Sequence, residues 1–286
     1  MSWIYVTEAG ARLGLREGRY VISREHEVLA EVPSEIVEGV TVIDAVQVSS
    51  RAIVDFLERD IPVTWLSTTG KFFGRLESTS AQDMSRVKEQ FARAEDAAFC
   101  LDLARLTVFR KIYNQRAILR SYNRRAESHL VQQTYDQIRI LADKLHTAKT
   151  VDEVMGYEGA VARLYFRALS EFLPEEFRFE KRTRQPPTDP FNSMLSFGYT
   201  LLMYDFYSAI ERTRLSPYIG YLHALKDGHP ALASDLMEPW RAAIVDAFCL
   251  ALVTHHEIDA SCFAKSEANG GTYLTRVGRR IFIQAY

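Results

Sequence analysis

The stretch that decides the fold is VKEQFARAEDAAFCLDLARLTVFRKIYNQRAIL, residues 87–119. It has no glycine or proline, and its apolar residues return every three or four positions, which is typical of helices with one buried face. The same period continues through nearly everything after Met84. We expect turns where glycine or proline interrupts it: at Gly156-Tyr157, Leu173-Pro174, 185–190, 215–217 and 225–230. Residues 81–286 are therefore predicted to form a large all-α domain.

The residues before this domain follow a different period. Short β-branched and aromatic runs alternate there with turn residues, which predicts strands: WIYV, ARLGL, RYVIS, EVLAEV, VTVID, PVTWLS and KFFGRLE. Between two of these runs, Ser49 and Ser50 precede an amphipathic stretch, RAIVDFLERD, with apolar residues at helical spacing. The fold class is thus α+β with two domains. A small β-rich N-terminal domain with one helix, residues 1–80, precedes the all-α domain, and the boundary lies near Ser80.

Composition excludes several classes of protein. The chain has 286 residues, 47% of them apolar, which is enough for a real core. Its longest strongly apolar stretch, residues 247–253, is far shorter than the roughly 20 residues that span a bilayer. The N-terminus lacks a basic segment followed by an apolar one. We therefore expect a cytoplasmic protein without a membrane partner.

Net charge and cysteine spacing exclude further classes of protein. The formal net charge is −2, so nucleic-acid binding would depend on a local basic patch. Cys100, Cys249 and Cys262 show neither zinc-site nor disulfide spacing.

Three places in the helical half carry side chains that bind hard metal ions. Glu158 lies between glycines at the predicted start of a helix, and His223 lies between an aromatic segment and a polar loop. Asp235 and Glu238 are three residues apart, so on a helix they point the same way and can serve one cation. Taken singly, each acid also suits the helix dipole and the histidine suits a hydrogen-bonded core position. Together they suit Mg²⁺ or Mn²⁺, which phosphodiester chemistry needs, although the spacing does not show that they meet.

A basic patch lies in the long helical stretch. Residues 103–126 contain no acid, and Arg116, Arg120 and Arg124 recur every four residues, which makes one positive stripe on a helix. A second cluster, around Arg182, precedes the QPPTDP turn. Such runs are often solvated helix faces, but a run without acids favours phosphate binding. The predicted DNA contacts are Arg110, Lys111, Arg116, Arg120, Arg124, Arg163, Lys181, Arg182 and Arg184.

Several ordered motifs resemble one known family. They are YEGAVARLYF, PPTDPFNSMLSFGYTLL and GYLHALKDGHPALASDLMEPWR in the helical half, and SSRAIVDFLERDIPVTWLSTTGKFFGRL before it. In their order and over essentially the whole length, they resemble the Cas1 integrases of CRISPR adaptation. The resemblance implies that Glu158, His223 and Glu238 are the catalytic metal ligands, with Asp235 beside the site. The family often has Asp in the third position, where Glu238 keeps a hard oxygen ligand.

The resemblance gives three further residues supporting roles. Arg163 would contact phosphate, Tyr165 would pack near the metal, and Asn192 would order a pair of helices. For Tyr165, an ordinary core position is an equally good interpretation.

The resemblance also implies an activity and partners. A metal-dependent DNA endonuclease and integrase would insert prespacer DNA into the CRISPR array through attack by a 3′ hydroxyl. The chain would bind double-stranded DNA, form a homodimer through its N-terminal sheets and join Cas2 in a heterohexamer, possibly with Cas4. Two alternatives stay open: a general metal-dependent nuclease acting on branched or linear DNA, and a non-catalytic DNA-binding scaffold.

Overall fold

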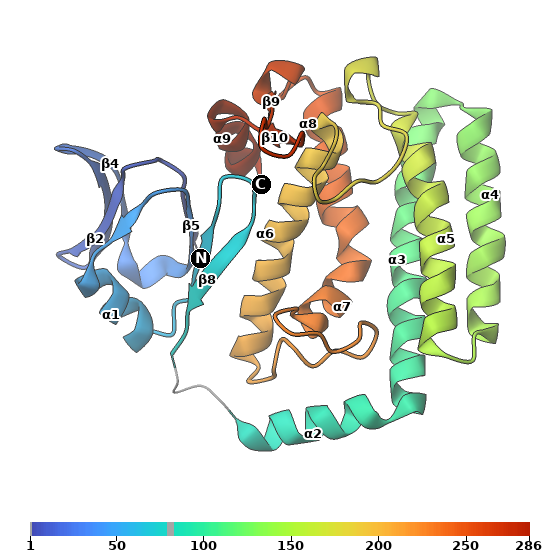
Figure 1. Ribbon diagram of the computed structural model, residues 1–286, viewed down its shortest axis with the longest axis horizontal. Helices are drawn as coiled ribbons and strands as arrows, with labels where there is room; N and C mark the ends of the chain where they lie inside the picture. Colours follow the sequence, from blue (N-terminus) through green and yellow to red (C-terminus); the bar gives the residue numbers. More distant parts are fainter. Residues whose placement is uncertain (1, 79–82) are drawn as a thin grey trace. The chain divides into compact units, whose positions relative to one another are not determined.

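Strands fill the N-terminal part of the chain and helices most of the rest (Figure 1). The computed structural model describes residues 2–78 and 83–286. The chain divides into two units, residues 1–81 and 82–286. The predicted α+β fold class, β-rich first and helical second, is confirmed. The predicted boundary at Ser80 lies outside the described residues.

The described strands of the N-terminal unit form two four-stranded sheets. The first has the order β1-β5-β7-β8, with β1, β5 and β7 parallel and β8 antiparallel to β7. The second has the order β4-β3-β2-β6, with β6 parallel to β2 and the other pairs antiparallel. The bounds are β1 Ser2–Val6, β2 Arg12–Arg16, β3 Arg19–Arg24, β4 Glu27–Pro33, β5 Val37–Ile43, β6 Gln47–Val48, β7 Val63–Leu66 and β8 Phe72–Leu76.

Helix α1, Ser50–Glu58, connects strand β6 to β7 and packs on the core of this unit. It begins where predicted, because the Ser49 hydroxyl accepts a hydrogen bond from the Ala52 amide at 3.3 Å. Its buried Phe56 lies against Tyr20 of β3, with ring centroids 4.7 Å apart. Burying side chains of this size stabilises the unit by about 1.5–3 kcal/mol each.

Long helices dominate the C-terminal unit. Their bounds are α2 Met84–Glu95, α3 Ala97–Ala126, α4 His129–Lys144, α5 Val151–Ser170, α6 Pro190–Arg212, α7 Ala231–Trp240, α8 Ala247–Thr254 and α9 Arg276–Ala285. A π-helical segment, Arg241–Asp246, joins α7 to α8. Helix α3 packs against α4, α5 and α7, so it stands at the centre of the helices that carry the candidate residues (Figure 1). Among the described residues, no helix has the length and apolarity needed to cross a membrane.

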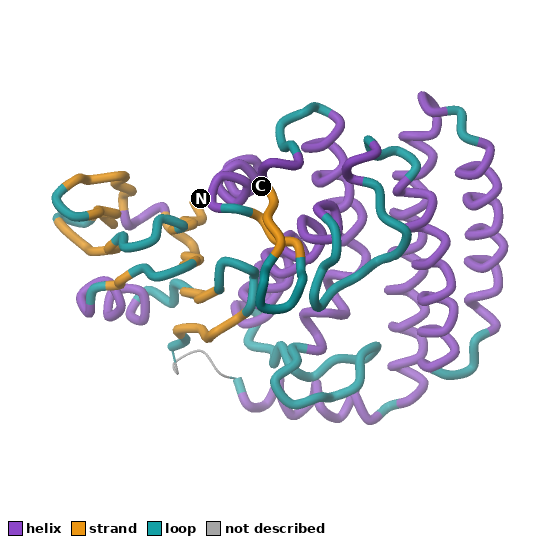
Figure 2. Tube along the Cα trace, turned by 45° about the horizontal axis from the view of Figure 1, so that its top comes forward, coloured by secondary structure: helices purple, strands orange, loops and turns teal. Residues whose placement is uncertain are grey.

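Two sequence-based expectations about this unit are wrong. Helix α5 runs without a break through Gly156 and Tyr157, so Glu158 lies well inside a helix and not at its start. Packing against α3 and α4 overrides the low helix propensity of glycine, which amounts to about 1 kcal/mol. The unit is also not entirely helical, because β9, Phe263–Lys265, and β10, Thr272–Leu274, form a short antiparallel hairpin (Figure 2).

Candidate active site

Two glutamates from different helices meet at one cationic side chain. Glu158 lies on α5, Glu238 on α7 and Lys111 on α3. The Lys111 ammonium donates to both carboxylates: its Nζ lies 2.5 Å from Oε2 of Glu238 and also contacts Oε1 of Glu158. Lys111 is 8% exposed and Glu238 is 5% exposed. Since buried charges are stable only with partners, the three side chains depend on one another.

Arg241 supplies a second positive charge to Glu238. Its Nε lies 3.0 Å from Oε1 of Glu238, the carboxylate oxygen that Lys111 does not bond. Burial alone raises the pKa of Glu238, but the charges of Arg241 and Lys111 outweigh burial and bring that pKa down to about 2. Glu238 is therefore ionised at neutral pH, as a metal ligand must be.

Asp235 fixes both His223 and the loop that carries it. Asp235 lies on α7, and His223 lies in the loop between α6 and α7. Oδ1 of Asp235 is 2.6 Å from Nδ1 of His223. The same carboxylate accepts hydrogen bonds of 2.6 to 3.0 Å from the backbone amides of Tyr221, Leu222 and His223. Because a carboxylate only accepts, Nδ1 carries the ring proton and Nε2 is the nitrogen that can face a metal ion.

These side chains are of the types that bind a divalent cation such as Mg²⁺ or Mn²⁺. Carboxylate oxygens are the hard ligands that such ions prefer, and here two carboxylates already share one positive charge. A histidine whose other ring nitrogen is bonded to a carboxylate is the usual form of a metal-ligating histidine. Within residues 2–78 and 83–286, no three His, Cys, Asp or Glu side chains are already arranged to hold a metal ion. The Lys111 ammonium occupies the position between Glu158 and Glu238.

The structure places Lys111 away from the arginine stripe of the same helix. Lys111 points at the two glutamates, whereas Arg116, Arg120 and Arg124 line a groove elsewhere on α3. Arg120 follows Lys111 by nine residues, which at about 100° per residue places the two side chains on opposite sides of the helix. Lys111 therefore lies on a different face of α3 from the stripe, and its predicted DNA contact stays a prediction.

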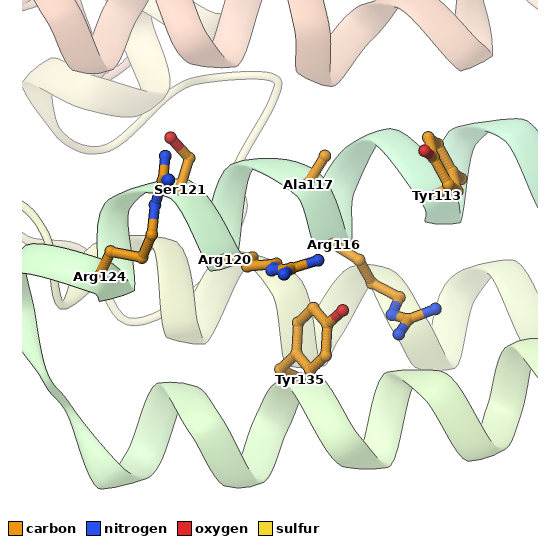
Figure 3. A pocket seen from close by; sticks show the side chains of 7 residues that line it. All are labelled: Tyr113, Arg116, Ala117, Arg120, Ser121, Arg124 and Tyr135. Atoms are coloured by element: carbon orange, nitrogen blue, oxygen red, sulfur yellow. The ribbon is translucent and has the colours of Figure 1, made fainter.

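The arginine groove lies between α3 and α4 (Figure 3). Its lining consists of Tyr113, Arg116, Ala117, Arg120, Ser121, Arg124 and Tyr135. The guanidinium of Arg116 lies over the ring of Tyr135, 4.5 Å from its centroid, and Arg120 and Arg124 are exposed. The lining that the structure describes includes no acid, so the groove has a positive field suited to phosphate groups.

Tyr165 is a fully buried residue of α5. Its hydroxyl donates to Oδ2 of Asp246 at 2.8 Å, and the Tyr199 hydroxyl donates to Oδ1 of the same carboxylate. Burial raises the pKa of Asp246 to about 6, although both hydroxyls act against the rise. Tyr165 thus belongs to a buried hydrogen-bond network.

Asn192 is also fully buried and fixes the segment before α6. Its side-chain oxygen accepts from Arg182 Nη1 at 2.8 Å and from the Thr183 amide at 3.1 Å. Its side-chain nitrogen donates to the carbonyl of Lys181 at 3.0 Å. Arg182 is consequently held against the protein, and burial lowers its pKa. The remaining basic candidates are exposed side chains: Arg110, Arg163, Lys181 and Arg184.

Three residues beside the candidate ligands were not among the predicted ones. Arg241 follows Glu238 by three residues, a spacing that the sequence could have revealed as an ion pair. Asn114 donates from Nδ2 to the carbonyl of Pro239 at 2.8 Å and so ties α3 to the end of α7. The ring of His229 lies 6.0 Å from that of His223, and burial lowers the pKa of His229. Only the folded loop brings the two histidines together.

Comparisons with known proteins agree on one family. The model of the family described as CRISPR associated protein Cas1 matches residues 4–286. A CRISPR-associated endonuclease Cas1 of Mycobacterium tuberculosis is 35% identical over 289 aligned positions, which cover 100% of this chain and 84% of the relative. A CAS1 protein from Thermotoga maritima has a similar solved structure, with a TM-score of 0.86, 25% identity, and coverage of 100% of this chain and 88% of that chain. A chain of a Cas6-RT-Cas1–Cas2 complex gives a TM-score of 0.85 at 27% identity, and the match covers 99% of this chain and 31% of that longer chain.

Proposed function

The chain belongs to the CRISPR-associated protein Cas1 family, and on that premise we propose that it is a metal-dependent DNA integrase and endonuclease of CRISPR adaptation. The observation that carries the proposal is the meeting of Glu158 and Glu238 at one cationic group. His223 is oriented by Asp235, which precedes Glu238 by three residues on α7. Two carboxylates and an oriented imidazole are the ligand types that a divalent cation takes. Compensation of helix dipoles would not require the two carboxylates to meet.

In this proposal, Glu158, Glu238 and Nε2 of His223 hold Mg²⁺ or Mn²⁺. Such an ion would neutralise the charge that develops on the phosphate oxygens of DNA. The protein keeps Glu238 ionised through Arg241, and Asp235 holds the proton of His223 on Nδ1.

The proposed reaction inserts prespacer DNA into the CRISPR array. A free 3′ hydroxyl of the prespacer attacks a phosphodiester at the edge of the repeat. The new P–O bond replaces the old one, whose 3′ oxygen leaves, so the number of phosphodiester bonds is conserved and no external energy source is needed. The reverse reaction would release branched strands and would be measured as nuclease activity.

The groove between α3 and α4 is proposed to hold the DNA backbone. Its three arginines have no acid beside them in the described lining, and two of them are exposed. Contacts to phosphate position DNA without reading its sequence. Lys181, Arg184, Arg110 and Arg163 are exposed and could extend this contact.

We also propose assembly as a homodimer with Cas2 as a further partner. The likeness to one chain of a complex named Cas6-RT-Cas1–Cas2 supports the Cas2 assignment. Dimerisation through the N-terminal sheets and an association with Cas4 stay predictions from the family resemblance.

A plasmid integration assay tests the proposed function. Short duplex DNA with free 3′ hydroxyls is incubated with supercoiled plasmid and with Mg²⁺, Mn²⁺ or EDTA, using the wild type, His223→Ala and Glu238→Ala. We expect strand transfer only for the wild type with a divalent ion, and DNA binding in all three proteins. Degradation of linear DNA lacking a 3′ hydroxyl would indicate a general nuclease instead. Equal DNA activities in all three proteins would indicate a scaffold.

A further inference from the structure

Lys111 is the shared counter-ion of the two glutamates among the proposed metal ligands. Its ammonium bonds to Glu158 and to Glu238, and its side chain is almost entirely buried between α3, α5 and α7. A buried and a half-buried carboxylate this close repel each other unless a cation lies between them. Lys111 therefore does, by its position, what a divalent ion would do there.

The two glutamates depend on Lys111 to different degrees. Glu238 has a second counter-ion, since Arg241 reaches its other oxygen. For Glu158, the described part of the chain provides no second basic partner. Removing the Lys111 charge would leave Glu158 without compensation and would create a stronger attraction for any cation that can bridge the two carboxylates.

We propose that Lys111 is a built-in competitor of the divalent cation, which holds Glu158 and Glu238 together in the metal-free protein and sets how tightly the metal binds. This inference rests on the proposed function, because it takes the two glutamates as metal ligands. An ammonium group and a divalent ion cannot occupy the same position between the carboxylates. Metal binding therefore requires the ammonium to move aside.

The displaced side chain stays next to the site. A lysine stem is flexible, so the ammonium can turn away from the carboxylates while remaining anchored on α3. From there its charge faces the region in which the proposed reaction places a phosphate group of DNA. Lys111 thus weakens metal binding and supports catalysis, and its removal should change the two properties in opposite directions.

Isothermal titration of the full-length protein with Mn²⁺, without DNA, tests this inference. We expect Lys111→Met to bind Mn²⁺ at least about tenfold more tightly than the wild type, because a competing unit charge has been removed. Lys111→Gln, which keeps a neutral hydrogen-bond donor and a similar length, should show the same direction if the methionine variant does not fold. Arg125→Met removes an equal charge from an exposed position of the same helix and should leave Mn²⁺ affinity unchanged.

Strand-transfer activity and the melting temperature of the Lys111 variants are two further measurements. Lys111→Met should lose strand transfer despite its tighter Mn²⁺ binding. Its metal-free melting temperature should fall, and Mn²⁺ should restore it. Mn²⁺ affinity that is unchanged or weaker in both Lys111 variants would overturn the inference.

Glu238→Gln separates this inference from the proposed function. If it abolishes Mn²⁺ binding while the Lys111 variants bind no more tightly than the wild type, the metal site stands and only the competition is refuted. If Glu238→Gln binds Mn²⁺ as the wild type does, both the site and the inference fail.

Discussion

Oδ1 of Asp235 lies 2.6 Å from Nδ1 of His223. The same carboxylate accepts hydrogen bonds from the backbone amides of Tyr221, Leu222 and His223. One acid on α7 therefore sets both the path of the loop and the orientation of the imidazole. With all these donors around it, Asp235 is suited to a positioning role, and the proposed metal ligand on α7 is Glu238.

Replacing Asp235 by asparagine should weaken this positioning. The Asp235→Asn side chain has one acceptor oxygen in place of two and loses the charge that stabilises the Nδ1–H tautomer. We expect strand transfer to fall about 10–100-fold, the usual effect of removing a carboxylate behind a metal-ligating histidine. Nitrogen NMR of His223 should show a changed tautomer population. Asp227→Asn, at an exposed position in the same loop, is the matched control. An unchanged tautomer would refute the positioning role.

Gly220 offers an independent way to disturb the same carboxylate. A Cβ at this position would lie 2.7 Å from Oδ2 of Asp235 and 2.8 Å from Cβ of Ala231. Gly220→Ala should therefore displace Asp235, lower strand transfer and destabilise the fold by about 1–3 kcal/mol, as overpacking does. Gly156→Ala, in the helix α5 and with nothing within 4 Å of the added Cβ, should keep or slightly raise stability. Urea unfolding of the two variants measures the difference, and equal stabilities would contradict it.

Reversing charge in the groove should change how salt affects DNA binding. Arg120 and Arg124 are exposed lining residues, so Arg120→Glu and Arg124→Glu can be made without removing the stacking of Arg116 on Tyr135. Each lost phosphate contact should make the slope of log affinity against log salt less steep by about 0.9. Fluorescence anisotropy with duplex DNA at several salt concentrations measures this slope. Arg125→Glu is the control, because Arg125 lies on α3 outside the groove lining. A salt slope unchanged in the groove variants would show that the groove does not contact DNA.

Local signals predicted most of the fold. Helix α1 begins behind Ser49 because a hydroxyl cap and an amphipathic stretch stand next to each other in the sequence. The β9–β10 hairpin was missed because each strand has only three residues, too few to show alternation. The break expected at Gly156 was wrong because burial of α5 outweighs a local propensity.

The candidate site was predictable in its residue types but not in its contacts. Glu158 and Glu238 come from separate segments, so only tertiary packing brings both carboxylates to Lys111. The position of Lys111 follows in part from helical phase, but its partners lie on α5 and α7 and leave no trace in the sequence around it. The bond between Asp235 and His223 likewise depends on a loop that turns back onto α7.

Asp246 should make folding stability depend on pH. Burial raises its pKa to about 6 in the folded protein, above the value near 3.9 of an unfolded chain. The folded state therefore binds this proton more tightly, and the resulting stabilisation is complete below about pH 4 and is lost as pH rises through about 6, by about 3 kcal/mol. Asp246→Asn, which cannot ionise, should lack this loss. Urea unfolding from pH 4.5 to 7.5 compares the two proteins. The lowered pKa of Glu238 acts only below this range, because its contribution is lost as pH falls from about 4.5 toward 2. Parallel stability curves for the wild type and Asp246→Asn would show that Asp246 does not titrate in this window.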